Sequence, residues 1–287
     1  MTKIACIGEA MIELSMAGDD AQVGVAGDTL NTAIYLRRTA PALLVDYMTC
    51  LGDDPFSARI QSFIADQGIG TSAILQIPHK SPGLYAITTT ADGERSFTYW
   101  RNTSAARQLF SDGDFDRLAT YDAVYLSGIS LAILPHEVRI ALLEWLEKSS
   151  ITVIYDSNYR PRLWDSVEHA RQITTAMWQR ADVALPSIDD EMALFDETDA
   201  QVTDRFSQHK STGALKRGAD GPLSLGETVE QNYPAATHVV DTTAAGDSFN
   251  GSYLGAYLTG QDQAAALMSG HMLAAKVVQH RGAIIPA

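Results

Sequence analysis

The stretch VVDTTAAGDSFNGSYLGAYLTG, residues 239–260, carries the strongest structural signal in the chain. Its first residues predict a strand that ends near Asp241, and the residues from Gly246 onward predict a helix. The first N–H groups of a helix lack intrahelical partners and the helix dipole is positive there, so such an end binds anions. We expect the small residues Ala244, Ala245 and Gly246 to let a phosphate group approach the main chain closely.

Asp247 lies in the first turn of the same predicted helix. Its carboxylate could accept the proton of an attacking hydroxyl, and a weak base suffices because the transition state of phosphoryl transfer is loose. We expect the positive end of the helix to keep this carboxylate ionised. Taken alone, an acidic residue here can equally serve only to complement the helix dipole, and that alternative stays open for this segment by itself.

Strand-like apolar runs alternate with helical patterns through most of the chain. We expect strands over residues 3–8, 45–51, 123–126, 152–156 and 181–185. This alternation predicts an α/β fold in which helices cover both faces of a parallel sheet. The clearest helix is HEVRIALLEWLEK, in which one stripe contains Val138, Ala141, Leu142, Trp145 and Leu146.

The segment PGLYAITTTADGERSFTYWR, residues 82–101, interrupts this alternation. It predicts two antiparallel strands joined by a short turn that contains glycine. A three-residue loop over 91–93 would set Tyr85 opposite Tyr99 and would place both on one face with Arg101. We expect this register, because a shared face of aromatic and cationic side chains could bind a ligand.

The composition is that of an ordinary globular protein of 287 residues, 46% hydrophobic and 20% charged. A net charge of -14 argues against nucleic acid and anionic membranes as partners. The first residues do not follow the pattern of a secretory signal and no apolar run of about 18 residues occurs, so we expect a cytoplasmic protein. Cys6 and Cys50 fit small buried hydrophobic side chains. The histidines at 136, 169, 271 and 280 show no metal-ligand spacing and are expected to be structural or exposed.

Polar residues follow several of the predicted elements, and each group is ambiguous alone. GDTLN, residues 27–31, could be an ordinary helix cap. Asn158 and Arg160 follow a predicted strand, at the end where parallel sheets bind ligands, but they could also lie in a surface loop. LKRGADGP, residues 215–222, could be a simple turn, and PSIDDE, residues 186–191, an acidic first turn of a helix.

Together these segments resemble the ribokinase-like (PfkB) carbohydrate kinases. DTTAAGD is similar to the family signature D-T-x-G-A-G-D, and GDTLN and KRGADG are similar to its G-G-x-x-x-N and K-x-G-x-x-G elements. The resemblance implies a three-layer α/β fold with a mainly parallel central sheet and a small β-sheet lid. It implies a single domain over 1–287, with the lid formed from about 9–26 and 82–102. Ala244 replaces the first glycine of the signature triplet, and we expect its methyl group to demand a negative φ.

The resemblance also implies roles for individual residues. The anion hole and the catalytic base would be Ala244, Ala245, Gly246 and Asp247. The sugar would contact Gly27, Asp28, Asn31, Tyr85, Tyr99, Arg101, Arg160 and Asp247. ATP would contact Asn158, Arg160, Lys216, Gly218, Gly221 and residues 244–246. Magnesium must accompany ATP, and its candidate ligands are Asp190 and Glu191, although the family commonly carries asparagine where this chain has Ser187. A requirement for a monovalent cation stays open.

Four further segments, PGLYAI, TYWRN, YLSGISLAIL and NYRPRLW, resemble the kinases of 2-keto-3-deoxygluconate within this family. This resemblance implies ATP-dependent transfer to the 6-hydroxyl of a keto sugar acid, whose carboxylate needs cations such as Arg101 and Arg160. Two alternatives stay open: a kinase of a neutral sugar such as fructose or ribose, and a sugar-acid sensor without catalysis. Exposed edges of the lid make a homo-oligomer conceivable.

Overall fold

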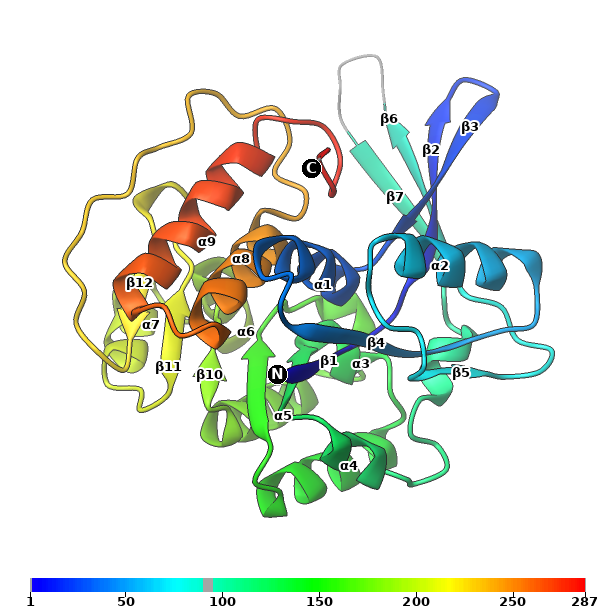
Figure 1. Ribbon diagram of the computed structural model, residues 1–287, viewed down its shortest axis with the longest axis horizontal. Coiled ribbons are helices and arrows are strands. Elements are labelled where there is room, and N and C mark those ends of the chain that lie inside the picture. Colours follow the sequence, from blue (N-terminus) through cyan, green and yellow to red (C-terminus); the bar gives the residue numbers. More distant parts are fainter. Residues whose placement is uncertain (1, 90–94, 287) are drawn as a thin grey trace.

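Two β-sheets organise the protein in the computed structural model, which describes residues 2–89 and 95–286 (Figure 1). The larger sheet has eight strands in the order β12-β11-β10-β9-β8-β1-β4-β5. Their bounds are β1 Lys3–Ile7, β4 Leu44–Leu51, β5 Ile74–Gln76, β8 Ala123–Ser127, β9 Thr152–Asp156, β10 Val183–Ala184, β11 Thr212–Leu215 and β12 Leu223–Leu225. Neighbouring strands run parallel except β11 and β12, so the predicted α/β fold with a mainly parallel sheet is confirmed.

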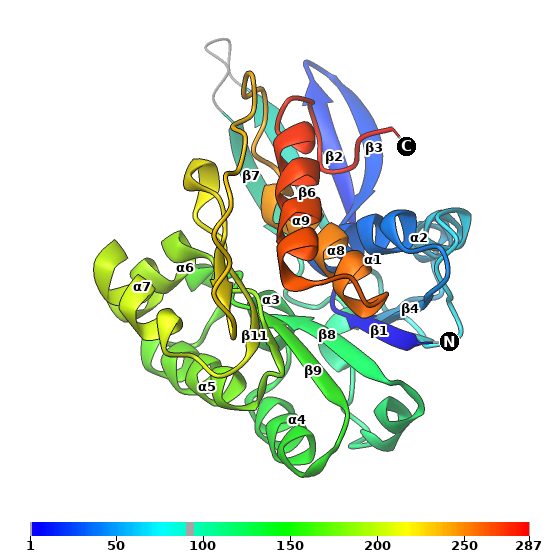
Figure 2. The same cartoon turned by 60° about the vertical axis from the view of Figure 1, so that its left-hand side comes forward.

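Helices cover both faces of this sheet and complete a three-layer fold (Figure 2). One face carries α1 Asp28–Thr39, α2 Pro55–Asp66, α8 Ala245–Leu258 and α9 Gln263–Val277. The other carries α3 Gly128–Ala132, α4 His136–Lys148, α5 Val167–Arg180, α6 Ile188–Phe195 and α7 Asp199–Ser207. Short 3-10 turns occur at Ala105–Gln108, Asp116–Thr120, Pro161–Leu163 and Gly218–Asp220. A separate apolar core fills each side of the sheet, and both Cys6 and Cys50 are buried in these cores without a disulfide.

The smaller sheet contains four strands in the order β3-β2-β6-β7. Their bounds are β2 Met11–Ala17, β3 Asp20–Ala26, β6 Gly83–Thr89 and β7 Arg95–Trp100. Tyr85 on β6 pairs with Tyr99 on β7, and their rings stack with centroids 5.5 Å apart. The predicted register is therefore confirmed, whereas the loop predicted over 91–93 lies outside the described residues.

The small sheet emerges directly from the carboxyl end of β1. This strand lies between β4 and β8, which is the point where the strand order of the large sheet reverses. Open α/β sheets bind ligands outside the carboxyl ends of the strands at such a point. The chain packs tightly where it crosses between the sheets: a β-carbon on Gly27 would lie 2.3 Å from the backbone oxygen of Glu9. The backbone contact at this position requires glycine. A β-carbon on Gly83 would lie 2.5 Å from Oε1 of the same glutamate and would displace its carboxylate.

Helix α4 has the bounds that the sequence predicts, but its buried face is rotated. Val138, Leu142 and Leu146 are buried as expected. Ala141 is exposed, and Arg139 is buried instead. Arg139 can be buried because its guanidinium donates to the backbone oxygen of Leu134 and to Asp165, which periodicity of apolar residues does not reveal.

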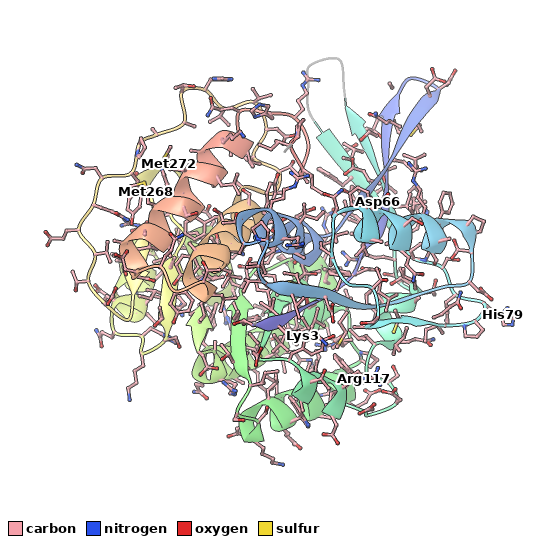
Figure 3. All side chains as sticks on the ribbon, viewed as in Figure 1. Lys3, Asp66, His79, Arg117, Met268 and Met272 are labelled. Carbon is pink, nitrogen blue, oxygen red and sulfur yellow. The ribbon has the colours of Figure 1, made fainter. Side chains whose placement is uncertain are left out.

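The strand expected before Asp241 is absent: residues 226–244 are all described and contain neither helix nor strand. The N–H groups of Val240 and Asp241 both donate to the backbone oxygen of Val278, at the end of α9. Val239 and Val240 are 63% and 48% exposed, and Met272 on α9 is also exposed (Figure 3). The β-branched pair predicts a strand, but the segment ends up pairing with the end of a helix instead of a neighbouring strand.

Ala244, immediately before α8, has φ 59 and ψ 19. The expected negative φ is therefore wrong. The chain turns sharply here, since the N–H of Ala245 donates to the oxygen of Thr242 and the N–H of Ser248 donates to the oxygen of Ala244. This left-handed conformation costs an alanine about 1–2 kcal/mol, whereas glycine adopts it freely.

We therefore expect Ala244→Gly to stabilise the protein. Relief of the left-handed strain exceeds the extra entropy that glycine gives the unfolded chain, for a net gain of about 0.5–1 kcal/mol. Ala245→Gly is the matched control, because Ala245 is helical and glycine there should lower stability by up to about 1 kcal/mol. Urea unfolding measures both free energies. Equal losses in the two variants would contradict the assigned strain.

Candidate active site

The carboxyl ends of the parallel strands and the first turns of two helices bring polar side chains together. These side chains are Ser127 at the end of β8, Asp156 at the end of β9, Lys216 after β11, Asp28 and Asn31 in α1, and Asp247 and Asn250 in α8. Nearly all belong to segments far apart in the sequence. The cluster therefore forms only when α1, α8 and the sheet are assembled.

Asp247 lies where the first turns of α1 and α8 meet. The Nδ2 group of Asn31 donates to its Oδ2 at 2.8 Å, and the hydroxyl of Thr32 donates to its backbone oxygen at 3.3 Å. Removal from water and the nearby carboxylate of Asp28 raise the pKa of Asp247 to about 8. The expectation that the helix end keeps this group ionised is therefore wrong, because desolvation and neighbouring carboxylates outweigh the dipole.

Asp28 accepts two hydrogen bonds on one oxygen. The hydroxyl of Ser127 donates to Oδ2 at 2.5 Å and Nδ2 of Asn158 donates at 2.7 Å. Burial raises the pKa of this carboxyl above its ordinary value, although both hydrogen bonds oppose the rise. Asn158 is one of the residues expected to contact ATP, and Asp28 is one of those expected to contact the sugar. Their hydrogen bond therefore brings the two sets of residues together near the ends of β8 and β9.

Arg160 lies at the exposed side of the site. Its side chain is 53% exposed, and Nη1 lies 3.1 Å from Oδ1 of Asp190. An ion pair this exposed contributes at most about 1 kcal/mol to stability. An anionic ligand could therefore readily replace Asp190 as the partner of the guanidinium. Arg162, which follows two residues later, is exposed.

Glu191 does not fit a magnesium site. It is fully buried in α6, where Nε1 of Trp178 donates to Oε1 at 3.2 Å and Arg205 donates to Oε2 at 3.0 Å. Burial raises its pKa to about 7. Asp190 points to the site side instead, as its contact with Arg160 indicates. A single carboxylate fits magnesium, which usually takes one or two protein carboxylates together with substrate phosphates and water.

Lys216 directly follows β11, and its side chain extends to the polar cluster. Its ammonium donates to Oδ1 of Asp156 at 2.9 Å and to Oδ1 of Asn250 at 3.2 Å. The chain then turns through Gly218, with φ 56, and Gly221, with φ 76. Both glycines have the left-handed backbone that the K-x-G-x-x-G spacing suits.

Tyr85, Tyr99 and Arg101 lie on one face of the small sheet. The ring of Tyr99 is 48% exposed, and the guanidinium carbon of Arg101 is 6.0 Å from its centroid. The hydroxyl of Tyr85 donates to Oε2 of Glu13. Arg101 is buried and donates from Nε, at 2.8 Å, and from Nη2 to Oε2 of Glu9.

The sequence interpretation missed Glu9 and Glu13, although both occur in the segment GEAMIEL. Glu9 is buried, and its Oε1 has no hydrogen-bond partner among the described residues. Its backbone oxygen packs against Gly27, so this residue links the α1 side of the site to Arg101 on the small sheet. An acidic residue between two apolar strands is the signal that could have identified it, because a buried carboxylate requires a partner.

Two of the histidines come together in the fold. The ring centroids of His136 on α4 and His169 on α5 are 5.0 Å apart, and Asp165 completes a group whose ligand atoms lie within 4.8 Å of one another. His136 is exposed and His169 is half-buried, in keeping with the expectation that they are structural or exposed. They meet although their sequence spacing is not that of metal ligands, because α4 and α5 contact each other. The guanidinium of Arg139 lies 2.7 Å from Asp165 and already neutralises that carboxylate.

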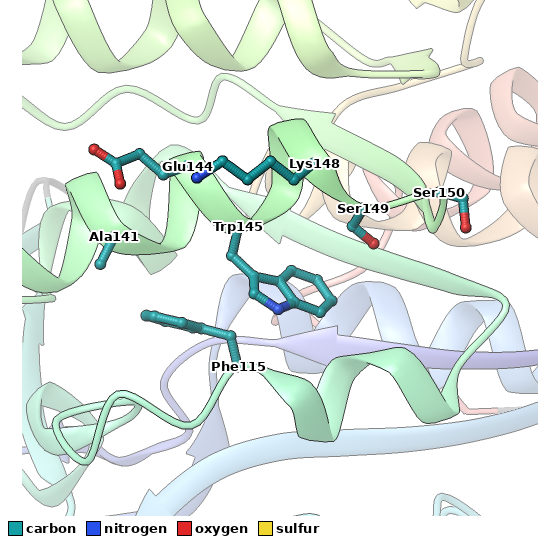
Figure 4. Close-up of a pocket in the computed structure, with 7 residues that line it drawn as sticks. All are labelled: Phe115, Ala141, Glu144, Trp145, Lys148, Ser149 and Ser150. Atoms are coloured by element: carbon teal, nitrogen blue, oxygen red, sulfur yellow. The ribbon is translucent and has the colours of Figure 1, made fainter.

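A shallow hollow of about 470 Å³ has a lining that shares no residue with the polar cluster around Asp247 (Figure 4). Its lining includes Phe115, Trp145 and Ser149. Ser149 and Ser150 precede β9, so the hollow borders the amino ends of the strands rather than their carboxyl ends. The indole of Trp145 donates to Asp116, and the arrangement offers no candidate catalytic group comparable to Asp247 within the lining.

The raised pKa of Asp247 predicts how stability depends on pH. Between the ordinary value of 3.8 and about 8, the folded protein keeps a proton that the unfolded chain has lost. The free energy of unfolding should therefore fall as pH rises through this window. Asp247→Asn should remove this part of the slope, while Asp66→Asn, at an exposed carboxylate, should retain it. Urea unfolding at pH 5, 7 and 9 measures the slopes, and identical slopes in all three proteins would refute the prediction.

Comparison with known proteins adds an independent result. The profile of the pfkB family carbohydrate kinases matches residues 1–287. The chain is 44% identical to a 2-dehydro-3-deoxygluconokinase of Dickeya dadantii (strain 3937), over 99% of this chain and 96% of that protein. It is 42% identical to a 2-dehydro-3-deoxygluconokinase of Escherichia coli (strain K12), over 99% of this chain and 97% of that protein.

Solved structures share the fold. A PfkB protein from Polaromonas sp. JS666 superposes with a TM-score of 0.82 at 25% identity, covering 97% of this chain and 96% of that one. A 2-dehydro-3-deoxygluconokinase from Thermotoga maritima gives a TM-score of 0.79 at 20% identity, covering 99% and 96%. With the full-length family match and relatives above 40% identity, the chain belongs to the pfkB family of carbohydrate kinases.

Proposed function

We propose that this chain is an ATP-dependent kinase of 2-keto-3-deoxygluconate, also called 2-dehydro-3-deoxygluconate. It would transfer the γ-phosphoryl group to the 6-hydroxyl and release 2-keto-3-deoxy-6-phosphogluconate and ADP. The observation that carries the proposal is the face formed by Tyr85, Tyr99 and the buried cation Arg101, in a chain whose net charge is -14. A neutral sugar would not require a buried guanidinium there. Relatives with 40–44% identity and the matching name support this substrate.

The carboxylate of the sugar acid would bind Arg101. Glu9 neutralises this guanidinium through Nε and Nη2 before any ligand arrives, which offsets the cost of burying the charge. The Nη1 side of the planar fork lies outside this pair and would be directed to the substrate. The hydroxyls of Tyr85 and Tyr99 would contact the keto and hydroxyl groups, and Gly27, Asp28 and Asn31 would hold the other end of the sugar.

The transfer step would use Asp247 as the base. The 6-hydroxyl gives its proton to this carboxylate while its oxygen forms a bond to the γ-phosphorus, and the bond from that phosphorus to the β–γ bridging oxygen breaks. A pKa of about 8 suits a base that works near neutral pH. The N–H groups around Ala244, Ala245 and Gly246 would stabilise the charge on the transferring group.

ATP would lie along Asn158, Arg160, Lys216, Gly218 and Gly221. Magnesium would neutralise the β- and γ-phosphates and would be held by Asp190.

Among the described residues, no helix has the length and apolar character needed to cross a membrane. We propose a cytoplasmic enzyme without a nucleic-acid partner, in which the small sheet closes as a lid and excludes water. Phe97 and Trp100 are exposed on the edge strand β7, which supports a homo-oligomer formed through this edge.

The substrate assignment is tested by ATP consumption with magnesium and each of four compounds at equal concentration. We expect 2-keto-3-deoxygluconate to exceed fructose, ribose and gluconate by at least tenfold in kcat/KM, or about 1.4 kcal/mol. Preference for fructose or ribose would keep a sugar kinase but reject the carboxylate assignment. No turnover with any compound, despite ATP binding, would favour a sensor.

Arg101→Lys tests the recognition of the carboxylate. A point charge replaces the planar fork, so KM for the sugar acid should rise at least about tenfold while KM for ATP changes by less than about threefold. Arg162→Lys is the matched control at an exposed arginine and should change neither constant. An unchanged KM for the sugar acid in Arg101→Lys would exclude this role.

A further inference from the structure

The ammonium group of Lys216 lies beside the beginning of α8. It lies 3.7 Å from the point that a β-carbon on Gly246 would occupy, in the first turn of α8. The N-terminal end of a helix carries a partial positive charge of its own. Two positive charges placed together repel each other unless something holds them or an anion lies between them.

Two buried side chains hold the ammonium there. Oδ1 of Asp156 and Oδ1 of Asn250 accept from Nζ of Lys216 at 2.9 Å and 3.2 Å. The other oxygen of Asp156 accepts from Nδ2 of Asn250 at 2.7 Å and faces the hydroxyl of Tyr125 at 3.4 Å. Asp156 is 2% exposed and Asn250 is fully buried, so this network cannot rearrange freely.

The network has a fixed orientation because each member comes from a different rigid element. Asp156 ends β9, Asn250 lies one turn after Asp247 on α8, and Tyr125 belongs to β8. Nδ2 of Asn250 also donates to the hydroxyl of Tyr125 at 3.0 Å, which fixes which end of the amide faces the lysine. The amide oxygen is thereby directed to Lys216.

We propose that Asp156 and Asn250 are positioning residues that hold the ammonium of Lys216 against the first turn of α8, where it contacts the γ-phosphoryl group of ATP. This inference rests on the proposed kinase function and assigns Lys216 to the transferred group rather than to the nucleoside. The helix end and the ammonium then form one binding site for an anion, and Asp156 neutralises the lysine until ATP arrives.

The same charges act on Asp247 in opposite directions. The carboxylate of Asp156 raises the pKa of Asp247, and the ammonium of Lys216 lowers it. The titratable groups that interact with Asp247 are Asp28 and Tyr35 from α1, Tyr125 from β8, Asp156 from β9 and Lys216 after β11. The pH at which kcat falls on the acidic side, here called the acidic limb, should therefore move in opposite directions when Asp156 or Lys216 is replaced.

The first experiment measures ATP and ADP affinities of the full-length protein by calorimetry. Lys216→Met and Asp156→Asn should weaken ATP binding at least about threefold while ADP binding stays within about twofold, because only ATP carries the γ-phosphate. Asp66→Asn, at an exposed acidic residue, is the control and should change neither affinity. Equal losses for ATP and ADP would overturn the inference, since a merely structural defect does not distinguish them.

The second experiment measures kcat against pH from 6 to 9.5 with the sugar that the wild type phosphorylates. Asp156→Asn should lower kcat at least about tenfold at pH 8 and move the acidic limb to lower pH. Lys216→Met should also lower kcat but move the limb to higher pH. Limbs that stay in place or move in the same direction would overturn the inference.

The two experiments separate this inference from the proposed function. If the wild type phosphorylates none of the sugars tested, the sugar-kinase proposal fails, and the difference between ATP and ADP affinities still decides the role of Lys216. If the wild type is active and Asp156→Asn retains kcat within about twofold, the proposed function stands and the positioning role of Asp156 fails.

Discussion

The close packing of α1 against α8 is the contact on which the site depends. A β-carbon on Gly251 would lie 2.6 Å from the backbone oxygen of Thr32, and glycine at this position lets the helix backbones approach closely. The two helix beginnings consequently meet, and Asn31 reaches Asp247 at 2.8 Å across a sequence separation of 216 residues. Any side chain larger than glycine at position 251 would separate the groups proposed to hold the sugar from the group proposed to accept its proton.

Three cations of the candidate site each pair with a carboxylate. Arg101 pairs with Glu9, Arg160 with Asp190 and Lys216 with Asp156. The carboxylates differ in burial, so the pairs differ in how readily an anionic ligand could displace the partner: the pair of Arg160 is exposed, whereas the other two are buried. In a protein of net charge -14, such pairing keeps cations at the candidate site without leaving a buried charge unneutralised.

Much of the fold follows from local patterns in the sequence. The alternation of apolar runs predicts the parallel sheet, and β9 and α4 have the predicted bounds. The Tyr85–Tyr99 register, by contrast, is predicted from the expectation that aromatic and cationic side chains share a ligand-binding face, and a shift of one residue would reverse the face of every side chain. The strand expected before Asp241 fails for a nonlocal reason, since β-propensity requires a neighbouring strand and the chain provides the end of α9 instead.

The sequence by itself determined the fold class, the family and most residues of the candidate site, because these depend on short segments with their own signals. The tertiary structure decided the raised pKa of Asp247, the left-handed backbone of Ala244 and the orientation of Glu191 into the core. It also decided that Glu9 pairs with Arg101 and that Asp156 and Asn250 pair with Lys216, because these contacts join distant segments. These properties depend on desolvation and on charges brought together from distant segments, and both exist only in the assembled fold.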